Sequence, residues 1–291
     1  MWKAYSNLRG AGSMRRVLKK IVTALVIILV LYFLLYILQN FWAHRQGKFV
    51  PDYQHVTLSE NSDYEIFFLQ TGLGQSAVDK LLRNDDFKTI LEVQNSFWKS
   101  EEIVCKPVFG LFSRVDKIST KSTPLLVDLQ PGDILVTLST HSAGWHHGHA
   151  GLVLDENSVL ECVKWGQESE VVKVGHWKKY SNYVVLRVKG VSKEQQQKVV
   201  AYAKEHLCGV PYRLTAGMFG EKSPDVNGKT FGTHCGHSVW YVWNQFGYDL
   251  DSDGGRLVTP YDLLRSKHLE VVQVYGIDPR EFLTKFKDVV Q

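Results

Sequence analysis

The sequence predicts an α+β protein preceded by one membrane-spanning helix, and three observations lead to this prediction. A long apolar run lies near the amino terminus, directly after a block of basic residues. From residue 129 onward, short strand-like runs alternate with turn residues. An amphipathic helical pattern begins at Cys235, apart from those strands. Helices that are segregated from a mainly antiparallel sheet define the α+β class.

The apolar run predicts a membrane anchor over residues 21–43. Ile21–Leu38 is apolar except for Thr23, and the run ends on the aromatic residues Phe41 and Trp42. Crossing the hydrocarbon core needs about 20 residues, with aromatic residues favoured at the interface. A buried core helix is disfavoured by the one-sided charge block before the run. A cleavable signal peptide is disfavoured because no small-x-small cleavage site follows it.

The charge pattern predicts the orientation of this anchor and excludes one class of partner. All six charged residues within 1–20 are basic, which predicts a cytoplasmic tail and an extracytoplasmic location for residues 44–291. Thirty-four basic residues less these six leave 28, against 30 acidic residues. The rest of the chain therefore has no net basic charge for nucleic acid, and we expect no nucleic-acid partner.

Between the anchor and the strand-rich part, the sequence predicts a stalk and an accessory region. Residues 44–62 are mostly polar, as expected of a stalk. Residues 63–124 are expected to form the accessory region, with two helices and two extended segments. The helical patterns cover Ala77–Leu82 and Ile90–Phe97, and the extended segments are Ile103–Val104 and Val108–Phe112.

Residues 125–291 are expected to form one domain. The predicted strands are Asp133–Leu138, Ala150–Leu154, Ser158–Val163, Glu170–Val174, Tyr183–Val188 and Glu270–Val274. Ser192 with Gln195 resembles a capping box, and it opens a helix that ends at Gly209. A short helix is expected at Pro260–Leu264.

Cys235 lies where a polar loop changes into the amphipathic helix. The apolar positions Val239, Val242, Trp243 and Phe246 form one helical face, with Thr233 as the expected cap and Gly247 as the expected stop. In the first turn, the helix dipole and the unpaired N–H groups favour negative charge and lower the pKa of a thiol. Cys235 is therefore a candidate nucleophile. The alternative is a small buried structural residue.

Two further residues complete a set for thiol chemistry. His149 is expected to open the second strand of the domain, and Glu161 to lie near the end of the third. A β-hairpin would bring both side chains to one face, where the carboxylate could fix the imidazole tautomer. A cysteine activated by a histidine that a third polar group orients is the general arrangement for acyl transfer.

The order of these motifs resembles a known family. Gly132-Asp133-Ile134, His149-Ala150-Gly151, Leu160-Glu161 and the later Cys235 occur in the order seen in YiiX-like proteins, the circularly permuted branch of the NlpC-type papain-like hydrolases. Flanking segments that also fit are Pro211-Tyr212, Trp240-Tyr241-Val242-Trp243, Tyr248-Asp249-Leu250-Asp251 and Val258–Leu263. The resemblance covers roughly residues 125–275. One departure is Cys235-Gly236-His237, where the family more often has a serine or a similar small residue after the cysteine.

The resemblance implies a permuted papain-like fold in which an antiparallel sheet packs against the helix that bears the nucleophile. It implies Cys235 as nucleophile, His149 as general base and Glu161 as the third member. Such a protein would be a cysteine peptidase or amidase of cell-wall peptides, acting through an acyl-enzyme. A lipid amide or ester hydrolase or acyltransferase, similar to lecithin:retinol acyltransferase, and a non-catalytic cell-wall-binding module remain alternatives. His234, His237 and Tyr212 are further candidates for the oxyanion site or the cleft.

Zinc is the main chemical alternative, because histidines cluster at 141–149 and at 234–237 beside a cysteine. A metal hydrolase would normally show an ordered spacing such as His-Glu-x-x-His, which is absent. We therefore expect no metal and no cofactor. Cys105, Cys162 and Cys208 show no paired Cys-x-x-Cys and no dense disulfide framework. The sequence leaves the oligomeric state open.

Overall fold

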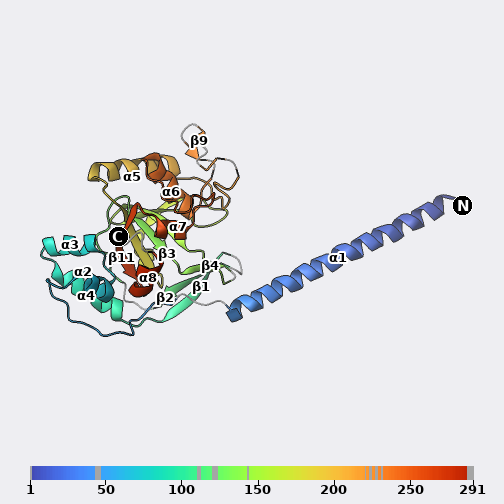
Figure 1. The fold of residues 1–291 in the computed structure, drawn as a ribbon. Helices are drawn as coiled ribbons and strands as arrows, with labels where there is room; N and C mark the ends of the chain where they lie inside the picture. Colours follow the sequence, from blue (N-terminus) through green and yellow to red (C-terminus); the bar gives the residue numbers. More distant parts are fainter. Residues whose placement is uncertain are drawn as a thin grey trace. The chain divides into compact units, whose positions relative to one another are not determined.

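A computed structural model describes the chain over residues 2–42, 47–109, 113–119, 124–142, 144–219, 221–222, 225–226, 229–230 and 232–286. By their contacts, the described residues up to 44, with 144–145, group as one compact unit, and those from 45 to 142 and from 146 onward group as a second (Figure 1).

The first unit contains one long helix, α1 (Trp2–Trp42). Its segment Met14–Leu38 has a mean hydropathy of 3.0 and none of it is buried. Twenty-five residues at 1.5 Å per residue extend for about 37 Å, which exceeds the roughly 30 Å hydrocarbon core. The protein thus has one amino-terminal helix that is long and apolar enough to cross a membrane. Ala43, the last residue of the predicted anchor, lies outside the described residues.

The second unit is built on a six-stranded antiparallel sheet with the order β11-β8-β3-β5-β6-β7. The strands are β3 (Ile134–Thr137), β5 (His149–Asp155), β6 (Ser158–Glu161), β7 (Glu170–Lys173), β8 (Tyr183–Val188) and β11 (Leu269–Tyr275). Each predicted strand of the domain is present, with ends that differ by no more than two residues from the prediction. The mainly antiparallel sheet of the predicted α+β class is confirmed.

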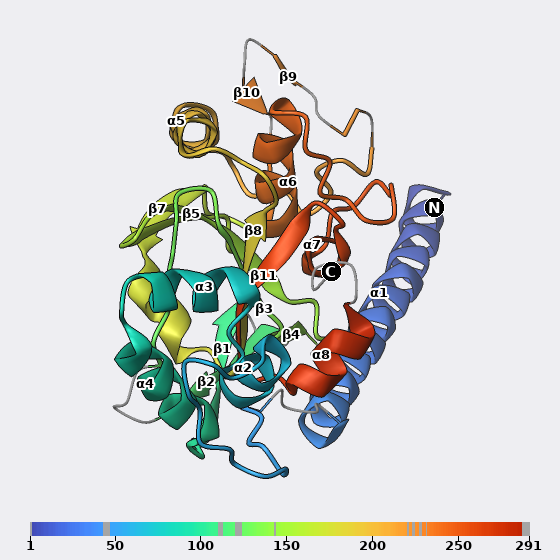
Figure 2. The same cartoon turned by 60° about the vertical axis from the view of Figure 1, so that its left-hand side comes forward.

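One face of this sheet is covered by the helices α5 (Lys193–Leu207), α6 (Cys235–Gln245), α7 (Pro260–Arg265) and α8 (Pro279–Lys285). Figure 2 shows α5 and α6 on the side of the sheet away from α2–α4. Strand residues such as Val136, Leu152 and Leu186 alternate toward these helices and meet Val239 and Val242 of α6 in one core. Ser192 caps α5, because its hydroxyl accepts from the Gln195 N–H at 3.2 Å, which is one of the two hydrogen bonds of the predicted capping box.

The opposite face is covered by the helices α2 (Tyr64–Thr71), α3 (Gln75–Arg83) and α4 (Phe87–Trp98). The two helices predicted in this region are present as α3 and α4, but α2, which ends where Gly72 adopts a left-handed φ of 72°, was not predicted. Leu135 and Val153 of the sheet pack with Ala77 and Ile90 of these helices. The region before residue 125 therefore shares a hydrophobic core with the sheet.

A second sheet of three antiparallel strands has the order β1-β2-β4. Its strands are β1 (Ile103–Phe109), β2 (Ser113–Ile118) and β4 (Thr140–Ser142). The predicted segment Ile103–Val104 lies in β1, and Val108–Phe112 is described only as far as Phe109. Elements that were not predicted from the sequence are β2, β4, the 3-10 helix η1 (Val174–Lys179), the two-residue strands β9 (Asp225–Val226) and β10 (Lys229–Thr230), and α8. These elements are too short to show a clear hydrophobic period.

Candidate active site

Cys235 is the first residue of α6, as the sequence predicted. The cap is His234 and not Thr233: the His234 ring accepts from the His237 N–H at 3.4 Å, while the Thr233 hydroxyl contacts the His237 ring at 3.0 Å. Cys235 is a free thiol and is partly exposed. It therefore combines solvent access with the positive end of a helix dipole, the setting of a reactive cysteine.

Gly236, directly after Cys235, lies at a close approach of two segments. A Cβ at this position would lie 2.2 Å from the backbone oxygen of Val258, which is far inside van der Waals contact. Only glycine fits where the start of α6 meets the segment before α7. The packing of these two segments fixes the position of Cys235.

His149 and Glu161 come together through the hairpin of β5 and β6. His149 is the first residue of β5 and Glu161 is the last residue of β6, and the two strands are antiparallel neighbours. The His149 Nε2 lies 3.4 Å from Glu161 Oε2, with both side chains buried. This separation is that of an ion pair rather than a full hydrogen bond, and catalytic hydrogen bonds are often loose before substrate binds.

The imidazoles of His149 and His234 lie near enough to the Cys235 thiol to act on its pKa. Burial by itself raises the pKa of Cys235, but the influence of His149 and His234 outweighs it, so the pKa falls well below its usual range. Burial lowers the pKa of His149, and its contacts with Cys235 and Glu161 outweigh that effect, so the pKa is raised. Both directions favour a thiolate–imidazolium pair at neutral pH.

Glu161 is held by two residues that the sequence analysis missed. Its Oε1 accepts from the indole N–H of Trp177 and lies 3.0 Å from the Nε2 of His176. The Trp177 ring also stacks on the His149 ring, with centroids 5.5 Å apart and planes 14° from parallel. Burial raises the pKa of Glu161, but the contacts with His149 and His176 outweigh it and lower the pKa to about 2. The carboxylate therefore stays charged beside the His149 ring.

The three secondary candidates occupy different environments. His234 is buried, and its Nε2 has no hydrogen-bond partner within the described part of the chain. His237 is used internally: one nitrogen contacts Thr233 and the other lies 2.8 Å from the Lys222 carbonyl oxygen. Burial lowers the pKa of His237 to about 4, so this ring is neutral. Tyr212 is half-buried on a segment that bridges Thr233, and burial followed by the nearby Cys235 charge raises its pKa.

A second thiol, Cys162, follows Glu161 in the chain. It is buried and donates to the Thr233 carbonyl oxygen at 3.3 Å. Burial, with a smaller contribution from the charge of Cys235, raises the pKa of Cys162 to about 12. Cys162 is therefore a protonated, structural thiol.

The histidines predicted as possible zinc ligands do not form one set. His149 and His234 surround Cys235, whereas His237 faces the interior. His141 lies elsewhere, in β4, next to Cys105 and Asp116. Among the described residues, these last three form a group whose donor atoms all lie within 4.8 Å of one another.

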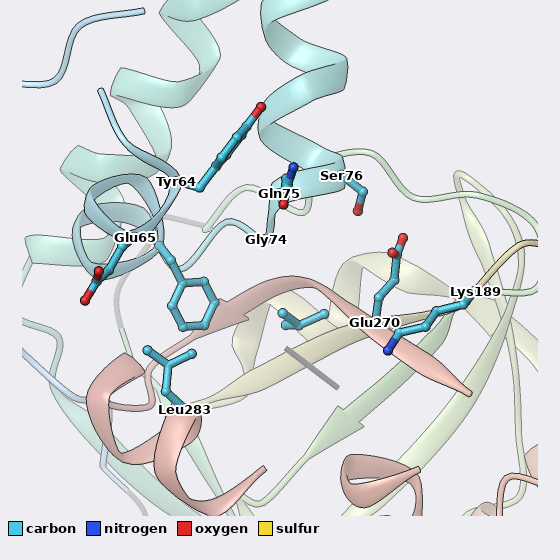
Figure 3. Close-up of a pocket in the computed structure, with 10 residues that line it drawn as sticks. Tyr64, Glu65, Gly74, Gln75, Ser76, Lys189, Glu270 and Leu283 are labelled. Carbon is cyan, nitrogen blue, oxygen red and sulfur yellow. The ribbon is translucent and has the colours of Figure 1, made fainter. Parts of the chain in front are cut away.

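A cavity of about 390 Å³ lies between α2, α3, β11 and α8, and it contains none of the predicted site residues (Figure 3). Its lining combines Glu65, Lys189 and Glu270 with the apolar side chains of Phe68 and Leu283. Acidic, basic and apolar groups are mixed there without a nucleophile or a paired base. Its chemistry does not indicate a catalytic centre, so Cys235 and its neighbours remain the candidate active site.

Comparisons with known proteins give one partial similarity. No protein-family model matches the chain, and no curated protein matches it. Among solved structures, the chain is similar to the crystal structure of metalloprotein yiiX from Escherichia coli O157:H7, with 21% identity and a TM-score of 0.37 over 49% of this chain and 96% of that chain. At this TM-score the similarity transfers neither activity nor ligands from that protein to this chain.

Proposed function

We propose that the protein is a membrane-anchored cysteine hydrolase that cleaves an amide bond, with a permuted papain-like catalytic domain over residues 125–291 outside the cytoplasm. One observation supports the proposal. His149 is buried 3.4 Å from the Glu161 carboxylate and acts on the pKa of the Cys235 thiol at a helix start. A nucleophile, a base and an orienting group in this order are the parts of thiol-mediated acyl transfer.

The first chemical step is attack of the Cys235 thiolate on the carbonyl carbon of the substrate. The imidazolium of His149 then gives its proton to the leaving nitrogen as the carbon–nitrogen bond breaks, which leaves an acyl-thioester on Cys235. Water, deprotonated by His149, attacks the thioester and releases the acid and the free thiol. Glu161 keeps Nε2 of His149 protonated and its ring oriented, with Trp177 stacked on the ring.

The developing oxyanion has donors at the start of α6. The N–H groups of Cys235 and Gly236 are in the first helical turn, where backbone donors have no intrahelical acceptor. The Nδ1 of His234 accepts the His237 N–H, so the nitrogen of this ring that can donate is the buried Nε2. These donors, fixed by a helix and its cap, suit stabilisation of a tetrahedral intermediate. His234 therefore supplies a third oxyanion donor in this proposal.

The proposed substrate is the amide of a cell-wall peptide, as the family resemblance implies. The apolar helix α1 is consistent with a protein that works at a membrane surface, where cell-wall precursors and lipids both occur. A lipid amide or ester is chemically within reach of the same thiol. The experiment must therefore offer both classes of substrate.

We would incubate the full chain in detergent with muropeptides and, separately, with membrane lipids, and analyse the products by mass spectrometry. The wild type and Cys235→Ala would be compared, with Cys208→Ala as the matched control because Cys208 is exposed and distant in sequence from the site residues. Cleaved peptide is expected with the wild type and with Cys208→Ala, and none with Cys235→Ala. Lipid products instead would change the substrate class.

One result would overturn the thiol mechanism itself. It is an activity that survives in Cys235→Ala or after alkylation of the thiols, and that a metal chelator abolishes.

A further inference from the structure

We propose that Cys105, Asp116 and His141 form a zinc site, separate from the candidate active site. The His141 Nε2 lies 3.8 Å from the Cys105 Sγ and 3.5 Å from the Asp116 Oδ1. Asp116 and His141 are fully buried, and Cys105 is partly exposed. The sequence analysis expected no metal, and it gave no role to Cys105 or Asp116.

The three side chains share one face of the small sheet because of strand register. Cys105 of β1 is directly opposite Asp116 of β2. His141 of β4 is opposite Arg114, two residues before Asp116 and therefore on the same face of β2. Ligands that come from three adjacent strands are held rigidly before an ion binds, which favours a specific metal site.

The direction of the contacts distinguishes a ligand set from a proton relay. Both Cys105 and Asp116 face the same nitrogen of His141. If that nitrogen carries a proton, it can donate a hydrogen bond to the carboxylate only. If it carries none, it can accept a hydrogen bond from the thiol only. A cation placed between the three groups satisfies the nitrogen, the sulfur and the oxygen together.

The separations fit tetrahedral zinc. Zinc bonds of about 2.3 Å to sulfur and about 2.0–2.1 Å to nitrogen or oxygen at tetrahedral angles place ligand atoms about 3.3–3.5 Å apart. The observed separations from His141 Nε2, 3.5 and 3.8 Å, are slightly longer, so a small inward movement of the side chains would suffice. A set of thiolate, imidazole and carboxylate favours zinc over magnesium or calcium, which prefer oxygen ligands alone.

Charge and access also agree with this assignment. A thiolate and a carboxylate are anionic ligands, which suit a divalent cation in a buried setting. The partly exposed side of Cys105 gives water access to the fourth ligand position. Three protein ligands with one position for water are common in zinc sites.

The site would stabilise the segment that leads to the candidate active site. The Gly148 N–H donates to the Thr140 carbonyl oxygen of β4 at 3.2 Å, directly before His149. His147 also contacts the Ser142 hydroxyl at 3.1 Å. An ion bound to His141 would therefore hold β4, and through it the start of β5, in place.

The test uses the full chain in detergent, loaded with zinc, dialysed, and analysed for bound metal by mass spectrometry. We expect about one zinc ion per chain in the wild type and in Cys235→Ala, and almost none in His141→Ala and Asp116→Asn. Cys208→Ala is the control for loss of an unrelated thiol. Circular dichroism of each variant checks that it is folded.

Cobalt substitution provides a second readout that identifies the thiol ligand. Cobalt loaded in place of zinc should give thiolate-to-cobalt charge-transfer absorption in the wild type and in Cys235→Ala. Cys105→Ser, which preserves size, should lose this absorption. The proposal is overturned if the wild type retains no zinc, as it would if Arg114 rather than a metal neutralised Asp116. It is also overturned if zinc is lost in Cys235→Ala and kept in His141→Ala, because the ion would then belong to the candidate active site.

Discussion

Two clusters of this protein contain the same chemical groups, a cysteine, a histidine and a carboxylate, but they arrange them differently. In the candidate active site, Nε2 of His149 faces Glu161 and the ring also reaches the Cys235 thiol. In the cluster of Cys105, Asp116 and His141, thiol and carboxylate both face Nε2 of one ring. The three groups are arranged in a line in the first cluster and around a single nitrogen in the second.

In the two functions that we propose, the direction of contacts, rather than the identity of residues, separates a proton relay from a ligand set. A relay needs one ring nitrogen for the thiol and the other for the carboxylate. A metal site needs all donors to converge on a single point. The local backbone agrees, because Cys235 begins a helix whereas Cys105 lies within a strand and has no helix dipole to stabilise a thiolate.

The largest expected effect comes from comparing alanine substitutions of the two histidines, one in each cluster. His149→Ala should slow alkylation of Cys235 at pH 6 by about 100-fold or more, because a thiol whose pKa returns toward about 8.5 is rarely ionised there. His141→Ala should leave the alkylation rate nearly unchanged and should abolish zinc binding. Labelling with iodoacetamide, followed by peptide mass spectrometry, measures the rate at Cys235 alone. Equal slowing by both variants would contradict the separation of the clusters.

The candidate active site could be predicted because its determinants are local. Cys235 is recognised from the helical period that follows it, and His149 and Glu161 belong to adjacent strands of one hairpin. The central sheet was predictable for the same reason, since each strand shows its own apolar pattern. The helix cap at His234 could not be predicted, because the choice between neighbouring polar residues as the cap depends on side-chain geometry.

The cluster of Cys105, Asp116 and His141, and the contacts that hold Glu161, depend on tertiary packing that no local sequence pattern indicates. Cys105 and Asp116 become neighbours only through the register of β1 and β2, and β4 is too short to be recognised. His176 and Trp177 lie in a 3-10 helix whose position over the hairpin follows from tertiary packing. Spacing along the chain therefore indicated neither set.

The next largest effect is thermal stability after removal of zinc. Zinc held at about 100 times its dissociation constant stabilises the folded state by about 2.7 kcal/mol. Its removal should lower Tm by about 5–10 °C for a domain of this size. Cys235→Ala should show the same shift, and Asp116→Asn should show none, when Tm is followed by circular dichroism with and without a chelator. If the effect of the chelator on Tm disappeared in Cys235→Ala, the ion would be bound at the candidate active site and not at the cluster of Cys105, Asp116 and His141.

The two carboxylates should differ in their effect on the pH profile. Glu161→Gln removes a charge that raises the pKa of His149, so that pKa should fall and the alkaline limb of the hydrolysis rate should move to lower pH. A charged hydrogen bond contributes about 1.5–3 kcal/mol, which corresponds to about tenfold or more in rate above the new pKa. Asp116→Asn should not change the pH at which the alkaline limb of the hydrolysis rate occurs. An unchanged profile in Glu161→Gln would contradict the relay.

The smallest expected effect tests the packing that holds Glu161 without removing any charge. A Cβ on Gly151 would lie 2.7 Å from Val159 Cγ2, and 3.2 Å from both Glu161 Cγ and Trp177 Cζ2. Gly151→Ala must therefore displace these side chains, at a cost of about 1–3 kcal/mol in the free energy of unfolding. Cys235 alkylation should fall less than in Glu161→Gln, because the carboxylate stays charged. Zinc binding should not change, since the second cluster lies on another sheet.

Gly175→Ala is the matched control, because a Cβ there meets no atom within 4 Å. It should alter neither Tm nor the alkylation rate. If Gly151→Ala lowered Tm but left the reactivity of Cys235 at the wild-type level across the pH range, the position of Glu161 would not govern the thiol. The arrangement of Cys235, His149 and Glu161 would then result from packing alone, and the two clusters would differ less in function than their geometry indicates.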